Sequence, residues 1–414
     1  MEYSDFRDKP IRHKALFFIW LMYAIVICSY SRFTFAQTGS KYQAIDSTIE
    51  RLLTEKHIPG FALCIVKDST MVWSKSYGEA DREEQILMDL DAIMNIGSIS
   101  KTFTATAALQ LWERGLLDFD EDINDYLDFR VRNPKYPESP ITVFQILTHT
   151  SSIQDGKSYS TGYSCGDPII SLRDWVFHNL TQGGKYYGDG KNFAEHAPGE
   201  EEKYSNLAFG LLGYIVEKIA RMPFRDYTEE HIFKPLEMNN TGWFIGEIDR
   251  KKHIRPYLYV TEENRDELLK WKRLFPNESE FKVGSLVGAC LYSFPNYPDG
   301  LVRTSVRELS FFLTAMMNGG SFKGRRILKG ETVGKMFSLQ IEGNNHRGLC
   351  WYKKDFGHSD RPLTLWGHNG TDPGIQTNLF LHPTERIGVV TFQNKTSDGI
   401  PEIIEALYLI TQNQ

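Results

Sequence analysis

Residues 95–115, NIGSISKTFTATAALQLWERG, carry the pattern that decides the fold. Ser98 and Lys101 stand three positions apart and precede an apolar run from Phe103 to Trp112. Residues at this spacing share one face of a helix, and a helix that is apolar nearly all round is buried. The sequence therefore predicts a buried helix with a serine at its first turn and a lysine within reach of the serine hydroxyl.

This serine–lysine pair has a catalytic and a structural interpretation. A serine at a helix start lies beside free backbone N–H groups, which favour a developing oxyanion, and a lysine in a dry pocket can have its pKa lowered until it acts as a base. However, serine is also a common helix N-cap. Ser279 and Lys282 repeat the S-x-x-K spacing in a segment that we expect to be a solvated loop. The pair alone does not establish a catalytic site.

Tyr204 and Asn206 form a second candidate element, just before an apolar helix that we expect from Leu207 onward. A phenol near a nucleophile can relay a proton, and an amide side chain can hold both a lysine and a substrate carbonyl. The alternative is that Asn206 caps the helix and Tyr204 packs against it.

The third element is His368-Asn369-Gly370, just before a C-terminal hairpin. A glycine such as Gly370 lets another group approach the backbone closely. The backbone N–H of Thr371 could then join that of Ser98 as a second oxyanion donor. Taken alone, His368 is more typical of a turn histidine.

Segments at both chain ends favour one sheet covered by helices. The predicted elements are a helix within 42–60, strands at Phe61–Val66 and Met71–Tyr77 with a turn at Asp68-Ser69, a hairpin within 377–394, and a helix from Pro401 to Ile410. The fold class that we predict is α/β (α+β): an antiparallel sheet from both chain ends, flanked by helices, with an all-helical lobe inserted at roughly 125–295. Residues 158–189 are expected to form a loop rich in glycine and tyrosine.

The N-terminal segment is typical of a secretory signal. Ala15 to Cys28 reads ALFFIWLMYAIVIC without a charge, which is shorter than the roughly 20 residues of a membrane span and suits a signal core. We expect cleavage after Ala36, with residues 1–36 as signal peptide and 37–414 as the exported domain, periplasmic or extracellular. The alternative is an uncleaved membrane anchor. Cys28 is a poor lipidation site because bulky Ile27 precedes it.

Composition excludes several other functions. The 414 residues have a formal net charge of −6 and no basic stripe, so nucleic acid is not an expected partner. The sequence contains no C-x-x-C pair, so a metal site built from thiols is not expected. Four cysteines remain after the signal, and export allows a disulfide without naming the pair: Cys64, Cys165, Cys290 and Cys350. We expect a small-molecule or peptide substrate, no cofactor and no metal; the oligomeric state is not indicated.

Five segments together resemble the serine beta-lactamase and penicillin-binding-protein superfamily. They are GSISKTFTA, LTHTSS, PGEEEKYSN, YPDGLVRTSVREL and GHNGTDPG, in that order within residues 42–396. S-x-x-K is one signature of this superfamily. The resemblance is to the class C-like branch, which contains esterases, D-aminopeptidases, D-alanyl-D-alanine carboxypeptidases and beta-lactamase-related proteins. It implies the same sheet with an inserted helical lobe.

The resemblance also implies roles for individual residues. Ser98 would be the acylated nucleophile, Lys101 its activating partner and Tyr204 the proton relay. The remaining implied positions are Asn206 as a substrate positioner, His368, Asn369 and Gly370 as the third wall of the site, and Thr371, whose amide joins that of Ser98 as an oxyanion donor. The sequence leaves open whether Lys101 or Tyr204 takes the serine proton.

Departures from the family pattern bear on the substrate. His368 stands where true beta-lactamases usually carry the lysine of K-T-G, and a histidine is mostly neutral near pH 7. We therefore expect a peptidase or esterase acting on a D-amino-acid peptide or ester-like substrate. The alternatives are a class C-like beta-lactamase and a non-catalytic protein that binds penicillin or peptidoglycan.

Three further expectations concern the surroundings of the site. Ser152 replaces the usual glycine after HTS, and His149 in the same segment is expected to be structural. Arg347 and the pair Lys353-Lys354 could meet an acidic substrate, but we expect them at the surface. Specificity should depend on the loops near 154–197 and 253–297.

Overall fold

The computed structural model describes residues 42–43, 45–357, 362–397 and 401–413. The predicted signal peptide, residues 1–36, lies outside them. The chain divides into two compact units, Met1–Glu50 and Arg51–Gln414. In the first unit residues 45–50 are helical, and everything below belongs to the second. Among the described residues, no helix is long and apolar enough to cross a membrane.

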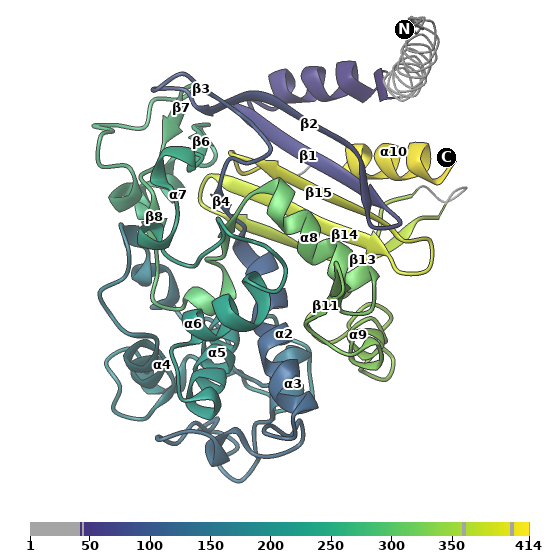
Figure 1. The fold of residues 1–414 in the computed structure, drawn as a ribbon. Helices are drawn as coiled ribbons and strands as arrows, with labels where there is room; N and C mark the ends of the chain where they lie inside the picture. Colours follow the sequence, from purple (N-terminus) through teal and green to yellow (C-terminus); the bar gives the residue numbers. More distant parts are fainter. Residues whose placement is uncertain (1–41, 44, 358–361, 398–400, 414) are drawn as a thin grey trace, which may run out of the picture. The chain divides into compact units, whose positions relative to one another are not determined.

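A seven-stranded sheet built from both chain ends organises the second unit (Figure 1). Its antiparallel pairs follow the order β12-β13-β14-β15-β1-β2-β3. The strands are β1 Gly60–Lys67, β2 Thr70–Asp81, β3 Ile86–Leu87, β12 Tyr352–Asp355, β13 Thr364–Asp372, β14 Ile375–His382 and β15 Ile387–Gln393. Asp68 and Ser69 have φ of 46° and 71°, as a two-residue hairpin turn requires. The predicted fold class is confirmed.

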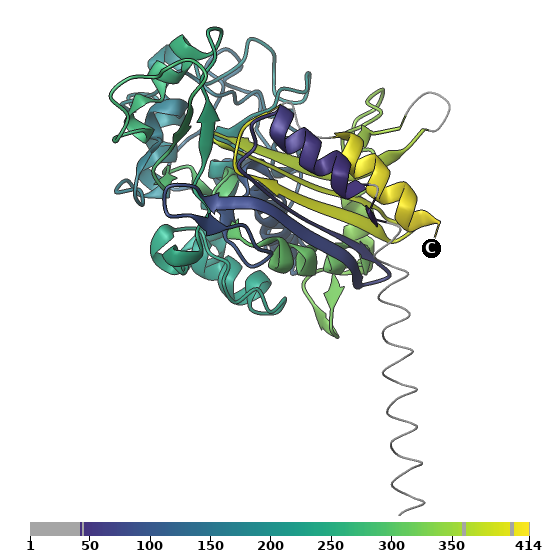
Figure 2. The same cartoon turned by 90° about the horizontal axis from the view of Figure 1, so that it is seen from above.

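Alternation along the strands gives the sheet two buried faces. In β1, residues Ala62, Cys64 and Val66 belong to the main core, and the side chains between them point to the other face. Helix α8 (Val306–Met317) lies on the first face and α10 (Pro401–Gln412) on the second (Figure 2). The C-terminal helix and hairpin thus form as predicted.

The inserted lobe is mainly helical rather than all-helical. Its helices, together with α2 before it and α9 after it, are α2 Ser100–Glu113, α3 Val143–Leu147, α4 Leu172–Leu180, α5 Asn206–Ala220, α6 Phe224–Thr228, α7 Arg265–Lys270 and α9 Gly330–Met336. It also holds two strand pairs, β5 Ser164–Cys165 with β8 Tyr292–Ser293 and β6 Tyr257–Tyr259 with β7 Leu286–Gly288. Two further pairs lie nearby, β4 Met94–Asn95 with β9 Arg303–Thr304 and β10 Ser321–Phe322 with β11 Arg325–Arg326.

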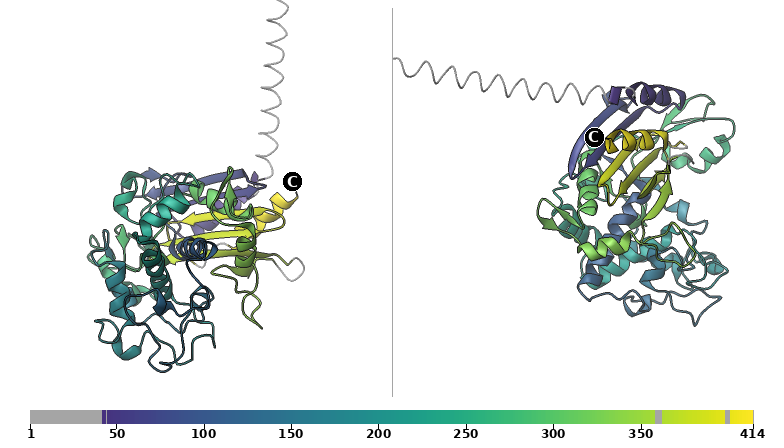
Figure 3. Two further views of the ribbon diagram at one scale, coloured as in Figure 1. Left: turned by 60° about the horizontal axis from the view of Figure 1, so that its bottom comes forward. Right: turned by 90° about the vertical axis from the view of Figure 1, so that its right-hand side faces the viewer.

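Helix α4 lies inside the segment that we predicted to be a loop. Ser171 caps it by accepting the Asp174 N–H, and its apolar residues Leu172, Trp175 and Val176 are buried. The glycines and tyrosines around it obscured this short helical pattern. The lobe lies beside the sheet in both views of Figure 3, and the predicted buried helix α2 lies where the two meet.

Candidate active site

Ser98 lies in the short 3-10 turn Gly97–Ile99, immediately before α2. It therefore precedes the helix instead of occupying its first turn, and it does not cap it: Ile99 is the N-cap residue and makes no side-chain cap bond. Lys101, in the first turn of α2, donates from Nζ to the half-buried Ser98 Oγ at 3.0 Å. Ser98 is therefore not the helix N-cap, which was the structural interpretation of the pair.

The Lys101 ammonium is buried and held by three acceptors within 3.0 Å. Besides Ser98 Oγ, it donates to Asn206 Oδ1 at 2.7 Å and to the Asp299 carbonyl oxygen at 2.8 Å. An ammonium has three N–H donors, so all of them are used. Burial alone lowers the pKa of Lys101, but the charges of Tyr204 and Asp299 outweigh it and raise the pKa above its ordinary value. The sequence analysis considered that burial could lower this pKa, and in the folded chain the neighbouring charges act in the opposite direction.

Tyr204 stands beside this pair. Lys101 Nζ lies 5.0 Å from the centroid of its ring, and the ring packs against that of His149 at 4.3 Å between centroids. Much of the ring is exposed, but burial of the hydroxyl raises the pKa of Tyr204, while the Lys101 ammonium and the Ser98 hydroxyl act in the opposite direction. The phenol thus interacts with both members of the serine–lysine pair.

Asn206 begins α5 but does not cap it, because Ser205 does so by accepting the Ala208 N–H at 3.1 Å. The Asn206 amide instead accepts from Lys101 and donates from Nδ2 to Asp155 Oδ2 at 2.7 Å. An ammonium can only donate and a carboxylate can only accept, so the two partners fix the orientation of the amide. Asp155, which the sequence analysis missed, also accepts the Asn206 N–H at 2.9 Å.

Strand β13 brings the third predicted element to the serine. A Cβ on Gly370 would lie 1.9 Å from the Ile96 carbonyl oxygen, and a Cβ on Gly97 would lie 2.9 Å from Thr371 N. Both positions must therefore be glycine if β13 is to lie against the Ser98 turn. The Thr377 hydroxyl fastens the two by donating to Ile96 O at 2.8 Å. The amides of Ser98 and Thr371 consequently lie on neighbouring segments.

His368 is a buried, neutral acceptor. Its Nδ1 lies 2.6 Å from the Asn369 carbonyl oxygen; since a carbonyl can only accept, Nδ1 carries the proton. Its Nε2 is buried and has no hydrogen-bond partner among the described residues. Burial, helped by the nearby Lys101 charge, lowers the pKa of His368 to about 3. The neutrality expected for this histidine agrees with its surroundings.

The predicted residues surround a cavity of about 540 Å³. It is lined by Ser98, Tyr204, His346, Arg347, Tyr352, Lys353, His368, Asn369 and Thr371. Lys101, Asn206 and Gly370 are not in its lining and support it from behind. Among the described residues, no group of three or more His, Cys, Asp or Glu side chains could hold a metal ion.

Two residues that we expected at the surface line this cavity, namely Arg347 and Lys353, whereas Lys354 is exposed. Arg347 is 6% exposed and donates from Nε to Glu202 Oε1 at 2.8 Å. Its Nη1 is buried without a hydrogen-bond partner in the described part of the chain. Arg347, which we expected at the surface, is thus a charged side chain in the lining of the cavity.

Asp299 is the main residue that sequence reasoning missed. Its carboxyl is buried, accepts from the Tyr159 hydroxyl at 2.6 Å, and lies 3.5 Å from Lys101 Nζ. Burial raises the pKa of Asp299 to about 6, although Lys101 opposes the shift. Its only signal was its place in YPDG, one of the segments that carry the family resemblance.

The HTSS segment supports the site from behind, as expected. His149 is buried, has a φ of 59°, and accepts the Ser205 N–H on Nδ1 at 3.3 Å. Burial, Arg347 and Lys101 lower the pKa of His149 well below its ordinary range. Ser152 has a φ of 58°, the conformation for which glycine is usual.

The geometry can now be compared with known proteins. The sequence profile of the family named Beta-lactamase matches residues 45–408. The chain belongs to the Beta-lactamase family. It is therefore a beta-lactamase-related chain, of a family that includes serine hydrolases and penicillin-binding proteins.

Curated relatives are distant. Protein flp of Staphylococcus aureus (strain MW2) is 23% identical over 370 residues, which are 89% of this chain and 66% of that protein. A penicillin-binding protein of Bacillus subtilis (strain 168) is 22% identical over 362 residues, 85% of this chain and 71% of that one. This Beta-lactamase family chain thus spans only part of the length of both relatives.

Solved structures share the fold. An octameric penicillin-binding protein homologue from Pyrococcus abyssi aligns with a TM-score of 0.69 and 24% identity over 89% of this chain and 76% of that one. A D-alanine carboxypeptidase from Burkholderia cenocepacia aligns with a TM-score of 0.64 and 20% identity over 91% of this chain and 99% of that one. A class C beta-lactamase from Rhodobacter sphaeroides aligns with a TM-score of 0.61 and 18% identity over 91% of this chain and 98% of that one.

Proposed function

We propose that this protein is an exported serine hydrolase that cleaves an amide or ester through an acyl-enzyme on Ser98. The observation that carries the proposal is the 3.0 Å contact from Lys101 Nζ to Ser98 Oγ at the wall of a cavity. A buried ammonium anchored by two further acceptors has a fixed position, and a fixed partner is what an activated serine requires.

The direction of that hydrogen bond bears on the base. Because Lys101 donates to Ser98 Oγ, the serine proton must point to another acceptor, and the Tyr204 oxygen is the neighbour that can take it. Lys101 donates to Ser98 Oγ, Asn206 Oδ1 and the Asp299 carbonyl oxygen, so in this proposal it stays protonated, holds Ser98 and stabilises a tyrosinate on Tyr204. Tyr204 is therefore the general base of the proposal.

The reaction then has two steps. Ser98 Oγ forms a bond to the carbonyl carbon as its proton moves to Tyr204, which reacts as the tyrosinate paired with the Lys101 ammonium, and the amides of Ser98 and Thr371 hold the oxyanion. The C–N or C–O bond breaks as Tyr204 returns the proton to the leaving group. Water, deprotonated by Tyr204, attacks the acyl ester and releases the acid, while the proton returns to Ser98.

The cavity wall favours an acidic substrate. Arg347, which is paired with Glu202, and Lys353 place two positively charged side chains in the lining. A guanidinium pairs well with a carboxylate. These cations support a peptide or ester that carries a carboxylate, such as a D-amino-acid peptide, and they supply the charge that neutral His368 does not.

Export has support from the disulfide between Cys165 and Cys290. Disulfides form and persist in oxidising compartments. Together with the apolar segment at 15–28, this favours a signal peptide of residues 1–36 and a periplasmic or extracellular domain. The mass of the protein recovered from the producing cells would distinguish cleavage after Ala36 from an uncleaved anchor.

The test is the intact mass of the purified protein after exposure to a fluorophosphonate and to a penicillin. The variants are Ser98→Ala and, as a matched control, Ser279→Ala, because exposed Ser279 precedes Lys282 at the same spacing. We expect adducts on the parent and on the control but none on Ser98→Ala. A penicillin adduct that decays quickly would favour a beta-lactamase, and one that persists would favour a binder or slow peptidase. Equal labelling of Ser98→Ala would refute the proposal.

A further inference from the structure

A second cavity, of about 520 Å³, adjoins the candidate active site. The two cavities share Thr371 in their linings. Along β13, the first cavity takes His368 and Asn369, and the second takes Asp372 together with Pro373, which follows the strand. Successive strand residues are about 3.3 Å apart, so a substrate at Ser98 can reach both.

One wall of this second cavity is aromatic and aliphatic. It includes Tyr159, Tyr163, Leu258, Leu268 and Trp271. The rings of Tyr163 and Trp271 meet edge to face with centroids 5.1 Å apart. The first cavity, by contrast, has a wall of cationic side chains, so the two cavities differ in chemistry on either side of the shared threonine.

The two tyrosine hydroxyls of this wall are already bonded. The Tyr159 hydroxyl donates to Asp299 Oδ2 at 2.6 Å, and the Tyr163 hydroxyl donates to Asp372 Oδ1 at 2.7 Å. Hydroxyls committed to buried carboxylates leave the ring surfaces to face a ligand. Such a wall binds apolar groups, since burying apolar surface is favourable and phenols already bonded have little to offer a polar group.

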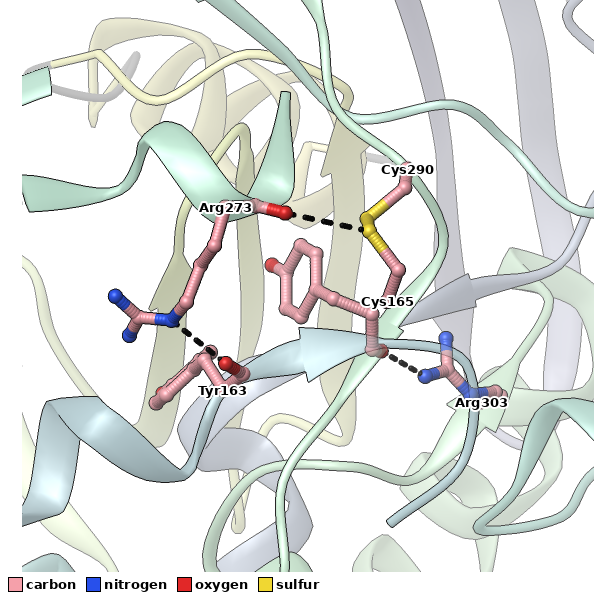
Figure 4. The surroundings of a disulfide bond; sticks show 6 residues. Tyr163, Cys165, Arg273, Cys290 and Arg303 are labelled. Carbon is pink, nitrogen blue, oxygen red and sulfur yellow. Dashed lines mark hydrogen bonds between the residues drawn. A yellow bond between two sulfur atoms is a disulfide. The ribbon is translucent and has the colours of Figure 1, made fainter. Parts of the chain in front are cut away.

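The wall is also fixed in place. The disulfide between Cys165 and Cys290 links the segment that contains Tyr163 to the segment that runs from Trp271 to Cys290. Arg273 fastens the same two segments by donating from Nε to the Tyr163 carbonyl oxygen at 2.7 Å (Figure 4). A pocket whose walls are held before the ligand arrives loses less entropy on binding.

We propose that this cavity, which we call the aromatic pocket, binds an apolar side group of the substrate that acylates Ser98. Its volume lies within the range of about 300–1,000 Å³ typical of ligand sites, ample for an aromatic or branched aliphatic group. The inference rests on the proposed function and names the substrate class: a carboxylate on the Arg347 side of the reacting carbonyl and an apolar group on the Trp271 side.

The test uses thioesters, in which the acyl group and the leaving group can each be varied alone. The S-ethyl thioesters of acetate and phenylacetate vary the acyl side, and S-benzyl thioacetate varies the leaving side. We expect the parent to favour the phenyl substrate in one series by about tenfold or more in kcat/KM, a typical discrimination for an apolar pocket. Trp271→Ala should abolish this preference. Leu269→Ala is the matched control, because Leu269 is 56% exposed on α7 beside the buried pocket residue Leu268.

A direct binding measurement separates this inference from the proposed function. The acetyl thioester tests the chemistry alone, because its turnover should disappear in Ser98→Ala. If kcat/KM is equal for the phenyl and methyl substrates, the pocket inference is overturned and the proposed chemistry still stands. Calorimetry of indole with Ser98→Ala requires no turnover. We expect binding that Trp271→Ala, added to that variant, weakens at least about fivefold and Leu269→Ala does not. Absence of indole binding, or binding unaffected by Trp271→Ala, also overturns the inference.

Discussion

Replacing Gly97 by alanine tests the proposed oxyanion site most directly. Gly97 has a φ of 52°, which costs an L-residue about 1–2 kcal/mol. The new Cβ would also lie 2.9 Å from Thr371 N, so β13 must move by about 0.5 Å to reach an ordinary contact of 3.4 Å. Oxyanion donors work only near hydrogen-bond distance, and losing one lowers kcat by about 10²–10³-fold. We expect that loss in Gly97→Ala.

Gly115→Ala is the matched control for this change. Gly115 has a φ of 68°, but a Cβ there would meet nothing within 4 Å. In urea, the free energy of unfolding should therefore be lower by about 1–2 kcal/mol in the control and by at least that much in Gly97→Ala. Only Gly97→Ala should lose turnover of the acetyl thioester. If folded Gly97→Ala protein turned over at the parental rate, the amides of Ser98 and Thr371 would not form the oxyanion site.

Three further outcomes are expected. Tyr204→Phe should slow acylation about 10²–10⁴-fold, followed by time-resolved mass spectrometry; a parental rate would exclude Tyr204 as the base. Burial raises the pKa of Asp372 to about 7 from 3.8, so the native state holds a proton that the unfolded chain releases. The free energy of unfolding should therefore fall as the pH rises from about 4 to 7. In parallel urea titrations, the free energy of unfolding of Asp372→Asn should fall less over the same range. Replacing Cys165 and Cys290 by serine should cost about 2–5 kcal/mol and reduce the phenyl preference without abolishing labelling of Ser98; unchanged preference would mean that the disulfide does not hold the aromatic pocket.

Local patterns were sufficient to predict the frame of this fold. The hairpin at Asp68-Ser69 has a turn of residues that tolerate positive φ between two apolar runs, and α2 is apolar on all sides. Both features depend on neighbours in sequence. The short strand pairs of the lobe join residues such as Ser164 and Ser293, which are far apart along the chain and too few to produce a periodic pattern, so they were not predicted.

The candidate site was predictable where its residues occur in short motifs. Ser98 and Lys101 are three residues apart, and Tyr204 and Asn206 are two apart. Asp299 lies 198 residues from Lys101, and nothing local marks it as the partner of a buried ammonium. The direction of the lysine pKa shift could not be read from the sequence for the same reason: burial is visible in an apolar sequence, whereas the opposing charges come from distant segments.

The Lys101 charge also bears on the histidine at position 368. The Lys101 charge already lowers the pKa of His368, so a lysine in its place would set a second buried cation against the first, and like charges repel strongly in a low dielectric. Arg347 avoids this problem because Glu202 partners it while its side chain still lines the cavity. In the proposed function, the cation that meets the substrate carboxylate has therefore moved from β13 to Arg347, and the loss of the family lysine need not mean the loss of anion binding.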